Sequence, residues 1–74
     1  MVGRNFWAVA DAEGWIVYEE GLPDRTTRHA DRDEAWQVAN RRAAELKGEA
    51  FLQDRDGTLA DRRHYGDFPR EIKP

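Results

Sequence analysis

Apolar and polar residues alternate in two short stretches near the start of the chain. Phe6–Ala10 and Trp15–Glu19 are rich in aromatic and β-branched residues, and the polar segment DAEG separates them. Two such stretches around a short polar segment predict a β-hairpin. Within the second stretch, alternation puts Trp15 and Val17 on one face of the strand, and Ile16 and Tyr18 on the other.

A helical pattern follows the hairpin. Asp31 and Glu34 form a D-x-x-E capping box, and Gly48 follows Lys47 as a C-terminal stop signal. At 3.6 residues per turn, small and apolar side chains share one stripe of this helix: Ala35, Ala39, Ala43 and Leu46, flanked by Trp36 and Val38. Arg42 falls inside the stripe. Either its aliphatic stem packs while the guanidinium reaches solvent, or it is held in an interface with a partner.

The stretch FLQDRDGTLAD, residues 51–61, contains a second hairpin signal. Ala50–Gln53 and Thr58–Arg62 are strand-like, and Asp56-Gly57 lies between them. An Asp-Gly pair is among the strongest signals for a two-residue turn, because glycine adopts the positive φ that the turn requires.

The letters DRDGTL within this stretch resemble the first motif of the haloacid-dehalogenase-like phosphatases. That resemblance implies a nucleophilic Asp54 and a second acid, Asp56, that shuttles a proton. Such an enzyme also needs a doubly wound sheet, a downstream Ser or Thr, a Lys and further carboxylates for Mg²⁺. Only 15 residues follow Leu59, they contain no Ser or Thr, and their one Lys is next to the end. We therefore interpret the stretch as a turn, and we expect no enzymatic activity, no catalytic residue and no cofactor.

Two segments have no periodic pattern. LPDRTTRHA, residues 22–30, is polar and begins with a Leu-Pro pair, which predicts a loop or a frayed extension. The tail HYGDFPREIKP is interrupted by glycine and proline, and Tyr65 and Phe68 are the residues that would fold back onto the sheet. We expect residues 1–5 and 70–74 to be frayed ends.

The order of these elements is ββαββ, which predicts the α+β class. We expect a single domain over residues 1–74, with one antiparallel four-stranded sheet and the helix packed on one of its faces. The predicted core draws on every element: Trp15, Val17, Ala35, Ala39, Ala43, Leu46 and Leu52. One helix covers only one face of such a sheet, so the other face is left to solvent or to a partner.

Composition narrows the chemistry of this domain. The 74 residues contain no cysteine and no serine, which excludes disulfides, thiolate metal sites and nucleophilic Cys or Ser. His29 and His64 lie in unlike segments without the spacing of metal ligands, so we expect no metal site. No long apolar run indicates a signal peptide or a membrane span, and we expect a cytoplasmic protein.

Charge separates the two binding functions that remain. Ten of the 12 basic residues are Arg, and Arg62-Arg63-His64-Tyr65 combines phosphate-binding and base-stacking groups. The net charge is −3, however, and an Asp lies beside almost every Arg, which is typical of a self-neutralising surface. A nucleic-acid-binding module that uses Arg62, Arg63, Tyr65 and aromatic residues of the sheet is therefore the alternative hypothesis.

The main hypothesis is a non-catalytic protein-interaction module. The chain has more aromatic side chains than one small core needs, so we expect a homodimer or a complex with another protein. The contact would use the free sheet face or an edge strand. By analogy with small acidic proteins of phages and plasmids, the partner would belong to host machinery. The candidate partner-binding residues are Trp7, Trp36, Arg42, Arg62, Arg63 and Tyr65.

Several short motifs follow one another in a set order along the chain. They are Gly14-Trp15-Ile16-Val17, Glu20-Gly21, Glu34-Ala35 with Ala39 and Ala43, Asp56-Gly57, and Tyr65-Gly66 with Pro69. In this order they resemble a family of small bacterial proteins of unknown function, over about residues 6 to 69. The resemblance supports the ββαββ fold and implies no catalytic residue. Arg42 departs from the family pattern, in which an apolar residue is expected.

Overall fold

The strands and the helix lie between residues 4 and 66, the range that the computed structural model describes, apart from the side chains of Pro23 and Asp24. Phe68, the predicted frayed end at 70–74 and residues 1–3 of the frayed end predicted at 1–5 lie outside the described residues, whereas Asn5 already begins a strand. The elements follow in the order β1 (Asn5–Asp11), β2 (Gly14–Glu19), β3 (Leu22–His29), α1 (Arg32–Leu46), β4 (Glu49–Gln53) and β5 (Leu59–His64).

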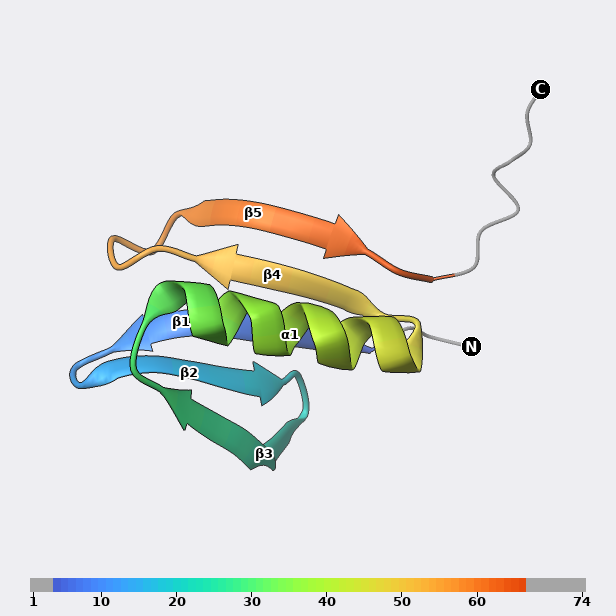
Figure 1. The fold of residues 1–74 in the computed structure, drawn as a ribbon, viewed down its shortest axis with the longest axis horizontal. Coiled ribbons are helices and arrows are strands. Elements are labelled where there is room, and N and C mark those ends of the chain that lie inside the picture. Colours follow the sequence, from blue (N-terminus) through green and yellow to red (C-terminus); the bar gives the residue numbers. More distant parts are fainter. Residues whose placement is uncertain (1–3, 67–74) are drawn as a thin grey trace.

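The strands form one five-stranded mixed sheet in the order β3-β2-β1-β4-β5. Only β1 and β4 are parallel to each other, while the other neighbours are antiparallel. The helix α1 lies across one face, against β1, β2 and β4 and to a lesser extent β3 (Figure 1). The predicted α+β fold with one helix on a sheet is confirmed. The predicted four-stranded antiparallel sheet is wrong, because β3 adds a fifth strand and α1 carries the chain back to place β4 parallel to β1.

The polar segment that predicts a loop is in fact the edge strand β3. It pairs only with β2, where Trp15 lies opposite His29 and Val17 opposite Thr27. A strand at the edge of a sheet needs no apolar periodicity when its side chains remain in solvent, and it tolerates proline near its start. The β-branched pair Thr26-Thr27 was the local signal for a strand in this segment.

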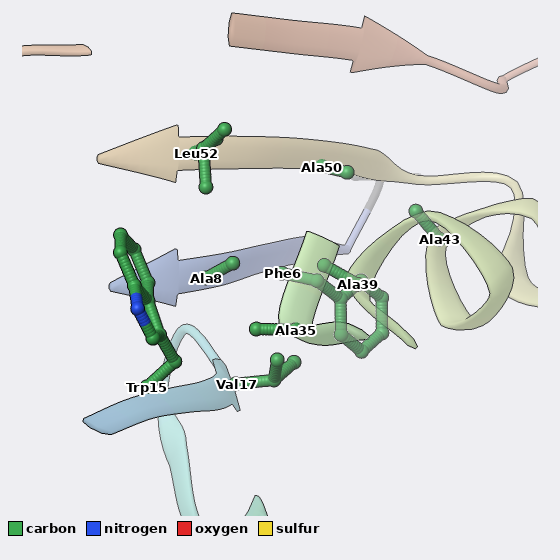
Figure 2. Close-up of a cluster of buried hydrophobic side chains, with 9 residues drawn as sticks. All are labelled: Phe6, Ala8, Trp15, Val17, Ala35, Ala39, Ala43, Ala50 and Leu52. Atoms are coloured by element: carbon green, nitrogen blue, oxygen red, sulfur yellow. The ribbon is translucent and has the colours of Figure 1, made fainter. Parts of the chain in front are cut away.

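The core lies between α1 and the sheet (Figure 2). Its buried residues are Phe6, Ala8, Trp15, Val17, Ala35, Ala39, Ala43, Ala50 and Leu52. Three of the alanines lie one turn apart on α1, and their small side chains let the helix approach the sheet closely enough to bury Phe6 to 1% exposure. Burial of a side chain of this size stabilises the fold by about 1.5–3 kcal/mol.

Leu46 is a predicted core residue that the structure does not bury. It is 43% exposed. Leu46 is the last residue of α1, and it lies beyond Ala43, the last buried residue of the helix. The helical pattern places Leu46 on the correct stripe, but the core ends before it.

At the C-terminal end of α1, the backbone leading into β4 passes very close to the backbone leading into β1. Lys47 has φ 57° and takes the left-handed conformation, which is the geometry that a glycine stop signal predicts for Gly48. Gly48 is needed for another reason: a Cβ built on it would lie 1.9 Å from the carbonyl oxygen of Arg4. The absence of a side chain at Gly48 therefore lets the start of β4 pass the start of β1.

Candidate functional site: the open face of the sheet

The Asp-rich connection between β4 and β5 is a turn in which one aspartate side chain accepts hydrogen bonds from a residue of the same turn. Asp56 Oδ1 accepts hydrogen bonds from the backbone N–H of Thr58 at 3.0 Å and from its hydroxyl at 2.7 Å. These hydrogen bonds hold the pKa of Asp56 below its ordinary value. Gly57 has φ 91°, as the turn interpretation requires. That interpretation is confirmed, although the connection runs from residue 54 to 58 and is longer than two residues.

The face of the sheet opposite α1, which we call the open face, carries a row of aromatic side chains. Residues alternate between the two faces of a strand, so Trp7, between the buried Phe6 and Ala8, points away from the helix. The strand registers place Tyr18 beside Trp7 and Trp7 beside Phe51. The rings of Trp7 and Phe51 are stacked, with centroids 4.5 Å apart and planes at 17°. Such a stacked pair contributes about 0.5–1.5 kcal/mol beyond its burial.

A second row on the open face is largely aliphatic. Ile16 lies opposite Val9, and Val9 lies opposite Gln53. The apolar side chains of both rows are half-buried. Among the described residues, no helix or strand packs over them, since α1 lies on the other face (Figure 1). The two rows thus form an apolar surface in the centre of the open face.

Paired charges lie around this apolar centre. At one corner, Arg28 donates to Asp11 Oδ2 at 2.7 Å. The Arg28 hydrogen bond is the main cause of a pKa for Asp11 below its ordinary value, and the backbone N–H of Glu13 acts in the same direction. The carboxylate of Asp11 therefore stays ionised at neutral pH and neutralises Arg28.

The opposite corner has a similar arrangement. Glu49 Oε2 lies 2.6 Å from Nδ1 of His64 and 3.8 Å from Nη2 of Arg62. In the same part of the face, Trp7 Nε1 donates to Glu20 Oε1 at 3.0 Å. The rim of the open face thus contains both signs of charge, already arranged in hydrogen bonds and ion pairs.

The helix side of the sheet holds a separate charged cluster around Glu19. This carboxylate is 3% exposed as a residue and accepts hydrogen bonds from Nε and Nη2 of Arg4. Arg42 lies over the Phe6 ring, 5.5 Å from its centroid, and donates to the carbonyl oxygen of Arg25 at 3.3 Å. The hydrogen bond from Arg4, together with the charges of Arg4, Arg25 and Arg42, holds the pKa of Glu19 below its ordinary value against the opposing effect of burial.

The structure divides the candidate residues of the sequence between two faces. Trp7 and Arg62 lie on the open face in one row, with Phe51 between them in register. The others lie on the helix side: Trp36, Arg42, Arg63 and Tyr65. Among these, the Tyr65 hydroxyl donates to Asn40 Oδ1 on α1, so this ring is bound within the fold.

Sequence reasoning missed four of the apolar residues of the open face as candidates: Tyr18, Phe51, Val9 and Ile16. The alternation of β2 was a usable signal for Tyr18, because Tyr18 points to the face of the sheet opposite to that of Trp15 and Val17. For Phe51 and Val9 the signal was weaker. It depended on the parallel pairing of β1 with β4, which no local pattern indicates.

Both histidines lie against neighbouring side chains. His29 is 2.8 Å from the hydroxyl of Thr27 and 3.2 Å from Glu34, and His64 contacts Glu49. Between residues 4 and 66, no three His, Asp or Glu side chains are grouped so as to hold a metal ion. The one helix of this range is too short and too polar to span a membrane.

Comparison with known proteins identifies the family. Residues 6–65 match the bacterial family described as "Uncharacterized protein conserved in bacteria" (DUF2188). No curated protein and no solved structure matches the chain. The matched range runs from the second residue of β1 to Tyr65 and includes α1 and all the other strands. The resemblance drawn from the ordered motifs is confirmed, and this chain belongs to that family of bacterial proteins.

Proposed function

We propose that this chain is a non-catalytic protein-interaction module that binds a protein partner through the open face. The observation that carries the proposal is the row of Tyr18, Trp7 and Phe51, which faces away from α1. Aromatic side chains are enriched in protein interfaces because they provide a large contact area from few rotatable bonds. A cytoplasmic location is part of this proposal, since small exported proteins commonly depend on disulfides and this chain has no cysteine.

The charges around the apolar centre support a protein partner over a nucleic acid. Arg28 is bound to Asp11, and Arg62 lies beside Glu49. A surface that binds phosphates gains affinity by releasing counterions from unpaired cations. On the open face each of these guanidinium groups already has a carboxylate, and Glu20 adds a further negative charge. A neutral polar rim around an apolar centre is instead the usual composition of a protein interface.

The alternative is a nucleic-acid-binding module, and one observation favours it. Arg62 extends the row of Trp7 and Phe51, so bases could stack on the rings while the guanidinium contacts phosphate. The site expected from the sequence also included Arg63 and Tyr65. These two residues lie on the helix side, away from that row. The alternative therefore rests on Arg62 alone among the three.

Capture of binding partners with variants of the open face tests the proposal. The tagged chain is incubated with lysate of its native host, with and without nuclease, and the retained proteins are identified. Val9→Lys and Tyr18→Ala change the two rows without touching the stacked pair. Gln37→Lys adds the same charge on the exposed surface of α1 and serves as the matched control. Far-UV circular dichroism checks that each variant is folded.

We expect a nuclease-resistant protein that binds the wild type and the Gln37→Lys control but neither variant of the open face. Equal retention by all four proteins would place the contact elsewhere and refute the proposal. If the retained material disappears with nuclease, the alternative gains support. In that case binding should weaken steeply with salt, and Arg62→Ala should abolish it.

A further inference from the structure

The strand β5 is an edge of the sheet that nothing covers within the described residues. Its six residues, Leu59–His64, are all exposed. Tyr65 N–H donates to the carbonyl of Gly48 at 2.9 Å, so this residue directs its backbone groups toward β4. Backbone groups alternate in direction along an antiparallel strand. Arg63 and Asp61 therefore also direct their backbone groups toward β4, while Arg62 directs its N–H and C=O groups away from β4.

Two side chains of opposite charge on β5 make no ion pair with another described residue. Asp61 and Arg63 lie opposite Leu52 and Ala50, so both are on the helix side of the strand. The one hydrogen bond of the Asp61 carboxylate is to the adjacent backbone N–H of Arg62, at 2.7 Å. Arg63 makes no hydrogen bond or ion pair with another described residue. An acid and a base that are two positions apart on an exposed edge are suited to a second strand of the same sequence.

We propose that two copies of this chain associate through their β5 edges, as an antiparallel strand pair centred on Arg62. Asp61 of each copy then lies opposite Arg63 of the other. Opposed side chains in an antiparallel pair are about 4.5–5.5 Å apart at Cβ, within reach of an ion pair. This association goes beyond the function of the open face and does not depend on it.

The register follows from the side-chain pattern. In a two-fold antiparallel pair about an axis perpendicular to the sheet, opposed residues share a face, so the centre falls on one residue. Centring on Asp61 opposes two carboxylates, and centring on Arg63 opposes two guanidinium groups. Only the centre at Arg62 gives two attractive pairs on the helix side. Like charges directly opposite each other are destabilising, and the other two registers contain no attractive pair that would offset them.

In the register centred on Arg62, the backbone and side-chain groups of the two Arg62 residues all have interaction partners. The two Arg62 residues exchange backbone N–H and C=O hydrogen bonds across the axis. This register also opposes the two Arg62 side chains on the open side, but each has Glu49 of its own chain at 3.8 Å to offset its charge. The Asp61 carboxylate leaves the Arg62 N–H that it holds in the single chain, and pairs with Arg63 of the other copy.

On the opposite edge of the sheet, Arg28 of β3 is already bound to Asp11 of its own chain, so this guanidinium is engaged within the fold. The β5 pairing is short compared with stable interfaces, which bury upwards of roughly 1,200 Å². We therefore expect a weak, reversible dimer that forms at high micromolar concentration, with one continuous sheet across both copies.

Exchange of the two charges tests the pairing. Sedimentation equilibrium of the wild type over a range of concentrations should give a mass that rises from 8.6 kDa toward twice that value. Asp61→Arg and Arg63→Asp, each alone, create two repulsive pairs and should remain monomeric. An equimolar mixture of the two variants restores both attractive pairs in a heterodimer, so its mass should rise again.

A matched control excludes attraction between the net charges of the two variants. Glu45→Arg makes the same charge change as Asp61→Arg, at an exposed position of α1. It should dimerise like the wild type, and its mixture with Arg63→Asp, which has one attractive and one repulsive pair, should contain much less heterodimer than the mixture of Asp61→Arg with Arg63→Asp. A wild type that stays monomeric at every concentration would overturn the proposal and show that the β5 charges keep the edge unpaired. Dimerisation that persists in both single variants would overturn it as well.

Discussion

At the scale of single residues, Glu19 is the one charged side chain that the described part of the molecule buries. Its two hydrogen bonds from Arg4 link the segment before β1 to the end of β2. Nothing local in the sequence predicts this pair, because the two residues are 15 positions apart and an acidic residue at the end of a strand normally faces solvent. Arg42 is explained by the same cluster: its guanidinium packs on Phe6 beside a buried negative charge.

Glu19→Gln should destabilise the fold at neutral pH, and the effect should fade in acid. The pKa of Glu19 is lower in the folded than in the unfolded chain, so the Arg4 pair stabilises the fold above about pH 4.5, the ordinary value of a glutamate. That contribution is lost as the pH falls through the lowered pKa. Loss of a hydrogen bond to a charged group costs roughly 1–3 kcal/mol.

Urea unfolding of both proteins across the acid range measures this effect. The difference in unfolding free energy between wild type and Glu19→Gln should be largest near neutrality and should shrink below about pH 4.5. Asp11 and Asp56 also have lowered pKa values, so both proteins should lose some stability in acid. A difference that stays constant with pH would mean that ionised Glu19 does not stabilise the fold through Arg4.

In the loop from residue 54 to 58, the glycine should matter more than the first aspartate. Gly57→Val should lower the unfolding free energy by about 1 kcal/mol or more, because a β-branched residue is strained at φ 91°. Asp54→Asn should be tolerated, because the loop uses the backbone N–H and C=O of Asp54. The Asp54 carboxylate itself makes one long ion pair, 3.9 Å, with the exposed Arg32. Thermal unfolding of both variants decides this, and equal harm would contradict the turn interpretation.

At the scale of elements, the helix was predictable and the strand beside it was not. Asp31 caps α1 as expected, with Oδ1 accepting the N–H of Glu34 at 2.9 Å, and the buried alanines lie on the predicted stripe. These signals are local, and capping and periodicity act within a few turns. The edge strand β3 follows from its pairing with β2, which is a long-range condition that a polar sequence does not reveal.

The junction of α1 with β4 should tolerate no side chain at Gly48. Gly48→Ala would bring a methyl group to 1.9 Å from the backbone oxygen of Arg4, so one backbone must move. Because Glu49 N–H donates to that same oxygen at 2.7 Å, the movement also weakens the pairing of β1 with β4. We expect a loss of several degrees in melting temperature, on the order of 4–8 °C per 1 kcal/mol for a domain of this size.

Gly21→Ala is the matched control for this junction. Gly21 has φ 86°, so alanine is strained there too, but a Cβ meets nothing within 4 Å. If Gly48→Ala costs no more stability than Gly21→Ala, the close approach to Arg4 is not what requires glycine.

At the scale of the whole molecule, the sequence predicts a spare sheet face but not its composition. One helix over one sheet leaves one face uncovered, whichever strands compose it. Which aromatic residues meet on that face depends on β1 lying between β2 and β4, so Tyr18 and Phe51 flank Trp7 only in the assembled sheet. The same assembly separates Arg62 from Arg63 and Tyr65, which are neighbours in the sequence.

The stability of the whole molecule should depend on its concentration if the β5 edges pair. Only folded chains have the edge, so association draws the equilibrium toward the folded state. Well above the dissociation constant, the concentration of free folded monomer grows as the square root of the total. Each tenfold increase in protein should then add roughly 0.7 kcal/mol to the apparent unfolding free energy per chain, half of the 1.4 kcal/mol of a factor of ten. Urea midpoints measured from high micromolar to millimolar protein should rise for the wild type and for Glu45→Arg. They should stay constant for Asp61→Arg, and a midpoint that rises equally in all three proteins would exclude the Asp61–Arg63 pairing as its cause.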